Sequence, residues 1–118
     1  LGGLIKGSVE ILKELYDKGY RLYALSNWSA ETLPLAQERY NFFPLFSGMV
    51  ISGQEKTIKP DPGLYKILLS RYQLDPAETL FIDDHSENTI AAAKLGMKTI
   101  DFVSPLQLRE ELTKRGIL

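Results

Sequence analysis

The sequence contains no cysteine and only one histidine, His85. The absence of cysteine excludes disulfide bonds, catalysis by a thiolate and zinc sites with cysteine ligands. A single histidine excludes a metal site built from several imidazoles. No apolar run approaches the length of a membrane span, and the first residues lack the layout of a signal peptide. We therefore expect a cytoplasmic enzyme or binding domain.

The chain also lacks a strong charge of either sign. Its 14 basic and 15 acidic side chains give a net charge of −1, so no basic surface indicates nucleic acid binding. A length of 118 residues, with 44% hydrophobic and 25% charged residues, predicts one globular domain over 1–118 with a single core. The chain opens Leu1-Gly2-Gly3-Leu4 without an initiator Met, and we expect a fragment of a longer protein.

Helical and strand patterns alternate along the chain. The spacing of apolar residues and the capping residues predict helices at 8–18, 29–40, 61–72, 86–95 and 104–116. Short apolar runs predict strands at 21–25, 49–52, 80–82 and 98–102. Regular alternation of this kind predicts an α/β fold, with a doubly wound, Rossmann-like parallel sheet covered by helices on both faces.

Two adjacent aspartates, Asp83 and Asp84, follow the apolar run Leu80 to Ile82. A buried parallel strand would deliver both carboxylates to the edge of the sheet where ligands of open α/β sheets bind. Adjacent carboxylates repel each other, and a hard cation such as Mg²⁺ relieves that repulsion. The alternative is that the aspartates only cap the next helix, with Ser86 as a second capping candidate.

Polar groups follow two further strand ends or loops. Ser26 and Asn27 end the first strand, and Lys59 precedes the helix that starts at Asp61. In a doubly wound sheet these groups and the aspartates emerge on one edge. A hydroxyl, an amide, an ammonium and two carboxylates could together bind a phosphoryl group and Mg²⁺.

Each of these residues also has an ordinary interpretation. The Ser26-Asn27 pair could be only a turn, and Lys59 could be one solvated loop lysine among several. Trp28 could pack in the core or form the floor of a substrate pocket. His85 is expected to be a solvated loop residue beside the aspartates. The prediction of a site therefore depends on the convergence of these residues rather than on any one of them.

Four segments resemble the haloacid dehalogenase superfamily of phosphohydrolases, in the order and with the spacing of that family: 22–27, 58–62, 80–84 and 93–97. The resemblance implies that Ser26 hydrogen-bonds the transferring phosphoryl group, with Asn27 beside it. It implies that Lys59 pairs with the nucleophile and the phosphoryl oxygens. It also implies that Asp84 is the direct Mg²⁺ ligand, while Asp83 acts through water or orients the ligands.

The implied activity is that of a Mg²⁺-dependent phosphatase for a small phosphorylated metabolite, working through an aspartyl-phosphate intermediate. A 2-haloacid dehalogenase on the same fold is one alternative, but that chemistry needs no cation, so the paired aspartates argue against it. A non-catalytic binding module on the same fold is the other alternative.

The family's first motif is absent from this chain. That motif is Asp-x-Asp at the end of an apolar strand, and its first Asp is the nucleophile; no Asp here is followed by another two residues later. The helical cap that largely selects the substrate is absent too, so Trp28 is the only hint of specificity. In the family the missing strand lies centrally, between the strands that end at Ser26 and Asp83.

Loss of a central strand would leave two unpaired edges facing each other. We therefore expect the chain to be inactive alone. We also expect its own missing N-terminal segment, or another copy, to fill the central position.

Overall fold

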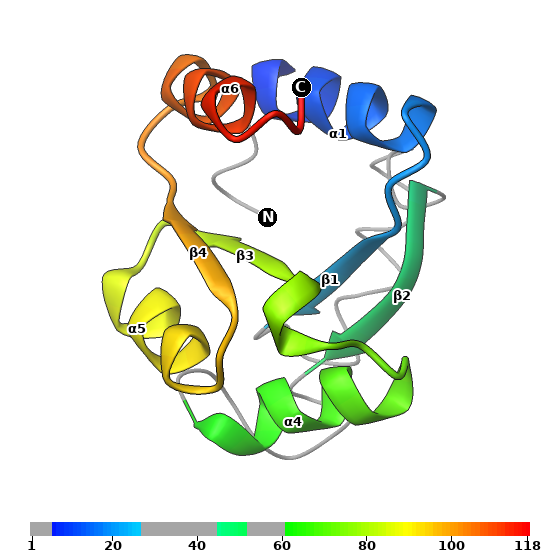
Figure 1. The fold of residues 1–118 in the computed structure, drawn as a ribbon, viewed down its shortest axis with the longest axis vertical. Coiled ribbons are helices and arrows are strands. Elements are labelled where there is room, and N and C mark those ends of the chain that lie inside the picture. Colours follow the sequence, from blue (N-terminus) through cyan, green and yellow to red (C-terminus); the bar gives the residue numbers. More distant parts are fainter. Residues whose placement is uncertain (1–5, 27–44, 52–60) are drawn as a thin grey trace.

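The computed structural model describes residues 6–26, 45–51 and 61–118 of the chain. The elements in this part are α1 (Lys6–Asp17), β1 (Leu22–Ser26), β2 (Phe46–Ile51), α4 (Pro62–Arg71), the short 3₁₀ helix η2 (Pro76–Glu78), β3 (Leu80–Asp83), α5 (Ser86–Lys94), β4 (Lys98–Asp101) and α6 (Pro105–Lys114) (Figure 1). The helix expected at 29–40 lies outside the described residues. Within the described ranges, no helix has the length and apolar character that a membrane span requires.

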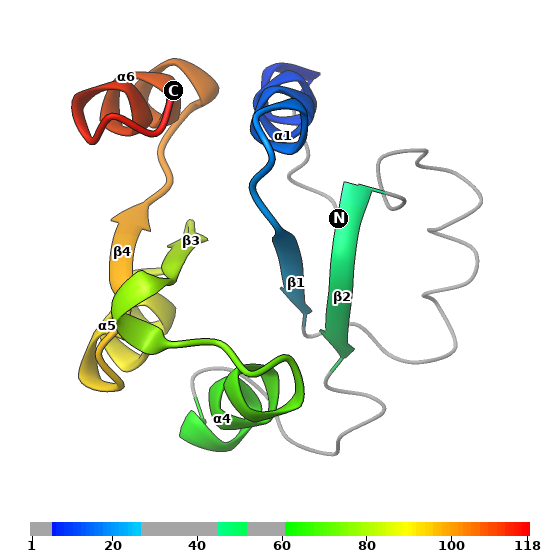
Figure 2. The ribbon, with the colours of Figure 1, turned by 45° about the vertical axis from the view of Figure 1, so that its right-hand side comes forward.

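The strands form two parallel pairs. Strand β1 pairs with β2 up to the Ser26–Ile51 match, and β3 pairs with β4 up to the Asp83–Asp101 match. Among the described residues these pairs are separate two-stranded sheets, and β1 and β3 are the inner strands in both ribbon views (Figure 2). Parallel strands alternating with helices confirm the α/β fold class. The separation of β1 from β3 agrees with a sheet that lacks its central strand.

Helices α1 and α6 lie on one side of the strands, and α4 and α5 lie on the other (Figure 1). The side chains of β3 alternate between these two sides because successive residues of a strand point in opposite directions. Leu80 and Ile82 pack against the α1–α6 side, while Phe81 packs with Tyr65 of α4 and Ala92 of α5.

Three hydrophobic clusters form the core of the described residues, and two of them contain residues of both strand pairs. The first cluster brings residues of both strand pairs together with α1 and α6; its buried members are Ile11, Leu15, Ile100, Leu108 and Leu112. The second and third clusters lie under α4 and α5, and Leu25 of β1 contacts both. Side-chain packing therefore connects the two sheets, although no described ladder of backbone hydrogen bonds does so.

The first helix begins earlier than its sequence predicts. Helix α1 starts at Lys6, so Ser8, the first residue of the predicted helix and its expected N-cap, lies inside the first turn and does not cap the helix. The buried face is formed by Ile11, which is 1% exposed, and Leu15, whereas Tyr16 is 50% exposed. Tyr16 therefore faces solvent rather than the core.

Strand β2 also begins earlier, at Phe46 rather than Met49. The prediction treated Gly48 as a strand boundary, whereas Gly48 pairs with Tyr23 of β1. A side chain at position 48 would overlap the aromatic ring of Tyr72, which lies over this glycine. The glycine therefore reflects close packing within a strand instead of a turn.

The starts of α4, η2 and α6 agree with their capping residues. The carboxylate of Asp61 accepts a hydrogen bond of 2.7 Å from the Gly63 amide at the start of α4. The hydroxyl of Ser104 accepts one of 3.1 Å from the Gln107 amide at the start of α6. Asp75 caps η2 through the amide of Ala77. Side-chain acceptors at these positions satisfy amides that have no partner within the helix.

Candidate active site

Asp83 is the last residue of β3, and its side chain is held firmly. The side chain is 7% exposed. One carboxylate oxygen accepts a hydrogen bond of 2.9 Å from the His85 backbone amide, and the other accepts one of 3.2 Å from the side-chain amide of Asn88. Its backbone carbonyl accepts from the Phe102 amide at 2.8 Å, which continues the pairing with β4. Two hydrogen bonds thus hold the carboxylate, and a third holds the backbone of the same residue.

Asp84 points outward from the same turn. Its side chain is 62% exposed, and one of its oxygens lies 2.8 Å from Nδ1 of His85. The same nitrogen lies 3.6 Å from Asp83. The hydrogen bond to Asp84 and then the negative charge of Asp84 raise the pKa of His85, because both favour the protonated imidazole. His85 is exposed as predicted, but it contacts Asp84 directly.

The turn after β3 explains this arrangement. His85 has extended backbone angles and occupies the N-cap position of α5, but its side chain makes no capping hydrogen bond. Ser86, the second capping candidate of the alternative interpretation, is the first residue of the helix and does not occupy the N-cap position. Asp83 instead accepts from the backbone of His85 and the side chain of Asn88. The aspartate therefore organises the start of the helix and remains beside Asp84.

The donor atoms of this turn suit a hard divalent cation. One possible ligand atom from each of Asp83, Asp84 and His85 lies within 4.8 Å of the other two. Carboxylate oxygens are the ligands that Mg²⁺ prefers, and Mg²⁺ usually keeps several waters and takes only one or two carboxylates. Asp84 is accessible to such an ion, whereas Asp83 has already committed both oxygens to hydrogen bonds. The geometry fits Asp84 as ligand and Asp83 as its support.

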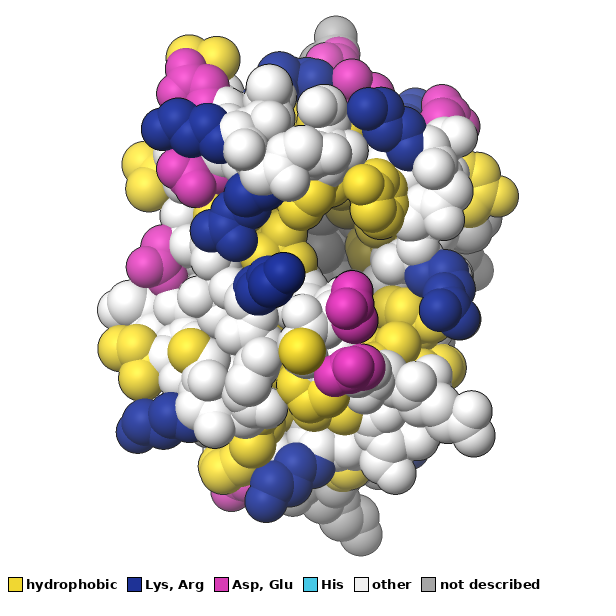
Figure 3. Space-filling model, in the orientation of Figure 1, with side chains coloured by type: hydrophobic (Ala, Val, Ile, Leu, Met, Phe, Trp, Pro, Cys, Tyr) yellow, Lys and Arg dark blue, Asp and Glu magenta, His cyan; other side chains and the backbone are white. Residues whose placement is uncertain are grey.

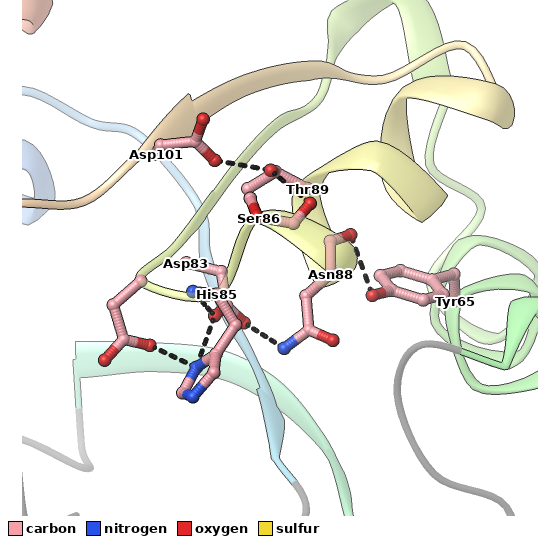
Figure 4. A network of polar contacts seen from close by, with 8 residues as sticks. Tyr65, Asp83, His85, Ser86, Asn88, Thr89 and Asp101 are labelled. Atoms are coloured by element: carbon pink, nitrogen blue, oxygen red, sulfur yellow. Dashed lines mark hydrogen bonds and ion pairs between the residues drawn. The ribbon is translucent and has the colours of Figure 1, made fainter.

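Two further hydrogen bonds fix the first turn of α5, and the sequence did not reveal them (Figure 4). The hydroxyl of Tyr65 in α4 donates to the backbone carbonyl of Asn88 at 2.9 Å. The hydroxyl of Thr89 lies 2.5 Å from a carboxylate oxygen of Asp101 in β4. Burial and, to a lesser degree, the charge of Asp83 raise the pKa of Tyr65 to about 12, so this hydroxyl remains a donor.

The other predicted site residues are only partly described. Ser26 is the last residue of β1, as Asp83 is the last residue of β3, so each stands at the carboxyl end of its strand. The side chain of Ser26 and the whole of Asn27, Trp28 and Lys59 lie outside the described residues. Their convergence with the aspartates stays a prediction.

The surface is hollowed near the middle of the face drawn in Figure 3. The hollow lies at the level of the space between the two strand pairs, with hydrophobic side chains on its rim and acidic side chains below it (Figure 3). An open, partly apolar surface at this position agrees with the separation of β1 from β3.

A family model described as haloacid dehalogenase-like hydrolase matches residues 3–102, which is most of the chain. The chain belongs to the haloacid dehalogenase-like hydrolases. The match includes the carboxyl end of β3 and the segments that carry Ser26 and Lys59. Both the resemblance seen in the sequence and the α/β fold class are thereby confirmed.

Individual relatives include a phosphatase and a magnesium-bound enzyme. The sesquiterpene phosphatase astK of Aspergillus oryzae is 33% identical over 102 residues, which cover 86% of this chain and 52% of astK. The wild-type enzyme bt-2542 of Bacteroides thetaiotaomicron, solved with magnesium and inorganic phosphate, is 28% identical with a TM-score of 0.72. That match covers 82% of this chain and 52% of bt-2542. The chain thus spans about half the length of these haloacid dehalogenase-like hydrolases.

A hydrolase from Streptococcus pneumoniae gives a closer match of the backbone. Its TM-score is 0.82 at 24% identity, and the match covers 93% of this chain and 57% of the hydrolase. At that identity the likeness shows the fold alone. The backbone of this chain therefore follows part of the fold of a larger hydrolase.

Proposed function

We propose that this chain forms part of a Mg²⁺-dependent phosphatase that acts on a small phosphorylated metabolite through an aspartyl-phosphate intermediate. The observation that carries the proposal is the pair Asp83 and Asp84 at the carboxyl end of β3, one carboxylate fixed and the other exposed. Relatives of the same family include a phosphatase and an enzyme bound to magnesium and phosphate, which supports this choice among hydrolases.

Asp84 would bind Mg²⁺ directly, and Asp83 would act through water or orient the ligands of the ion. Bound at Asp84, the ion would offset negative charge on the phosphoryl oxygens. Ser26 would hydrogen-bond a phosphoryl oxygen, with Asn27 beside it. Lys59 would neutralise charge that develops during transfer.

The nucleophile would come from a strand that this chain does not contain. Its position would be between β1 and β3, where the described strands form two separate pairs. A parallel strand there would complete the sheet, and an Asp at its carboxyl end would lie beside Asp84. The strand would come from the protein's own N-terminal segment or from another copy. Without it we expect no turnover, because no group would accept the phosphoryl group.

The experiment compares the chain with a completed version, in which a strand carrying Asp-x-Asp and a linker precede Leu1. A control version carries Asn-x-Asn in the same strand. Release of inorganic phosphate from a panel of phosphorylated metabolites is measured with Mg²⁺ and with EDTA. We expect phosphate release only from the Asp-x-Asp version with Mg²⁺. In that version Asp84→Asn should lower the affinity for Mg²⁺ by at least about tenfold. Loss of a supporting group already lowers metal affinity by about that factor, and loss of a direct ligand should cost no less.

Four outcomes would overturn parts of the proposal. Phosphatase activity of the chain alone at a normal rate would show that no additional strand is needed. Activity that persists in EDTA would contradict the metal dependence. Release of halide from a 2-haloacid without metal, in place of phosphate release, would identify the dehalogenase alternative. A completed version that binds phosphorylated ligands without turning them over would favour the binding module.

A further inference from the structure

The side chain of Tyr65 reaches from α4 to the start of α5. Tyr65 is fully buried, and its ring meets the ring of Phe81 edge-on with centroids 5.3 Å apart. Its hydroxyl donates to the backbone carbonyl of Asn88 at 2.9 Å. A buried hydroxyl must find a partner or incur a desolvation cost, so this bond fixes the helix pair at one spacing.

Asn88 passes this constraint on to Asp83. Asn88 is the third residue of α5 and is 7% exposed. Its backbone carbonyl receives the Tyr65 hydroxyl while its side-chain amide donates to Asp83 at 3.2 Å, so one residue links the two (Figure 4). The fully buried phenol thus stands one residue away from the carboxylate beside the candidate metal ligand.

We propose that Tyr65 is a positioning residue, which acts through Asn88 to hold the Asp83 carboxylate in place for the exposed ligand Asp84. The inference deepens the proposed function and rests on it for the role of Asp84. Tyr65 touches neither a substrate nor a metal ion in this scheme. Its effect is to restrict the motion of the turn 83–88 relative to α4, the helix that follows Lys59 in the sequence.

Thr89 supplies a matched control. It is the next residue of α5 and is 3% exposed, and its hydroxyl ties the helix to Asp101 of β4. Thr89→Val removes a hydroxyl that contacts both Asp101 and the Ser86 carbonyl, and Tyr65→Phe removes one that donates to the Asn88 carbonyl. Each variant therefore loses one buried hydroxyl at this helical turn. Only the Tyr65 bond leads through Asn88 to the Asp83 carboxylate.

The first measurement is hydrogen exchange at the His85 backbone amide, which donates to Asp83. In Tyr65→Phe we expect the exchange rate of the His85 amide to increase about tenfold more than that of the Ile100 backbone amide in the core. An increase of about tenfold is what the loss of one hydrogen bond produces. In Thr89→Val the two amides should accelerate by the same factor. Asn88→Ala deletes the side-chain amide that binds Asp83 and should reproduce the effect of Tyr65→Phe. It takes the place of Tyr65→Phe in the test if Tyr65→Phe folds poorly.

The second measurement is binding of Mn²⁺ to the 118-residue chain, detected by electron paramagnetic resonance. Mn²⁺ accepts the same oxygen ligands as Mg²⁺. We expect Tyr65→Phe and Asn88→Ala to lower the affinity for Mn²⁺ by about tenfold, as loss of a group that supports a metal ligand does. Thr89→Val should leave this affinity unchanged.

The outcomes separate the two proposals. If His85 and Ile100 accelerate equally in Tyr65→Phe, the tyrosine only stabilises the fold and the positioning role is wrong. If His85 accelerates selectively but the parent chain binds no Mn²⁺, Tyr65 does position Asp83 and the metal-binding part of the proposed function fails. A loss of Mn²⁺ affinity in Thr89→Val equal to the loss in Tyr65→Phe would also contradict the inference.

Discussion

Gly48 and Tyr72 show how a missing side chain determines packing at the scale of single residues. The ring of Tyr72 lies where a β-carbon on Gly48 would be, and it also packs on Tyr23 with ring centroids 4.9 Å apart. Tyr72 therefore has aromatic packing on one side and backbone on the other. Two aromatic side chains from β1 and the end of α4 can stack over β2 only because position 48 carries no side chain.

Gly48→Ala should destabilise the protein by about 1–3 kcal/mol, since a methyl group forced into packed space displaces the Tyr72 ring. Urea unfolding of the variant measures the change in the free energy of unfolding. In a Tyr72→Ala background the same substitution should cost little, because the space is then open. A full penalty in that background would show that Tyr72 is not the cause.

At this scale the sequence revealed Asp83 and Asp84 but not the residues that hold them. An apolar run followed by two carboxylates is a local pattern, so four or five neighbouring residues suffice to recognise it. The Tyr65–Asn88 bond joins residues 23 positions apart and exists only because α4 packs beside α5. Nothing near Tyr65 in the sequence indicates which carbonyl its hydroxyl will meet.

At the scale of elements, the helix starts divide into those with a side-chain cap and those without. Ser104 caps α6 through the Gln107 amide, and Gln107 in turn accepts from the Val103 amide at 3.1 Å. The serine and glutamine three residues apart were sufficient to predict this start. Helix α5 has an equally plausible serine, Ser86, but Ser86 is the first residue of the helix, and no side chain caps this start.

Ser104→Ala should cost about 0.5–2 kcal/mol of stability, the usual effect of deleting an N-cap acceptor. Ser86→Ala should change stability by no more than about 0.5 kcal/mol, because Ser86 lies inside α5 and is exposed. Thermal or urea unfolding of the two variants tests this difference. A larger loss for Ser86→Ala than for Ser104→Ala would contradict our assignment of the caps.

Helices α1 and α6 are joined by an ion pair between Glu14 and Arg109. Nη1 of Arg109 donates to Glu14 at 2.9 Å, and Nη2 contacts the other carboxylate oxygen. The hydrogen bond from Arg109 lowers the pKa of Glu14 below its usual value. A lowered pKa means that the folded state binds the proton less tightly than the unfolded state.

The contribution of this pair is therefore present above about pH 4.3, the ordinary glutamate pKa, and is lost as the pH falls through the lowered pKa of the folded state. NMR titration of the Glu14 carboxyl carbon measures the shift directly. Arg109→Gln should return the midpoint to its ordinary value, and added salt should weaken the effect because both side chains are exposed to solvent. An unchanged midpoint in Arg109→Gln would exclude Arg109 as the cause.

At the scale of the whole molecule, packing rather than a continuous sheet joins the two strand pairs. Leu112 of α6 is fully buried in the cluster that holds Ile11 of α1 and Ile100 of β4. The alternation of helices and strands in the sequence was sufficient to predict the fold class and the parallel direction of the strands. It could not give the first residues of α1 or β2, because those depend on which neighbours cover them.

Leu112→Ala should cost about 2–5 kcal/mol, since it leaves a cavity in this shared cluster. Leu106→Ala, in the same helix, should cost no more than about 0.5 kcal/mol, because Leu106 is 68% exposed. Urea unfolding monitored by circular dichroism compares the two. Similar losses would show that α6 contributes by its helical propensity and not by burial.

The first cluster unites residues from opposite ends of the chain. Its members include Ile11 and Leu15 near one end and Leu108, Leu112, Ile117 and Leu118 near the other. During synthesis the apolar face of α1 therefore cannot complete its packing until α6, which begins at Pro105, has been added. Contacts over such sequence separations slow folding and expose intermediates to aggregation. We expect the nascent chain to need protection until α6 has been made, a dependence on timing that the folded structure does not show.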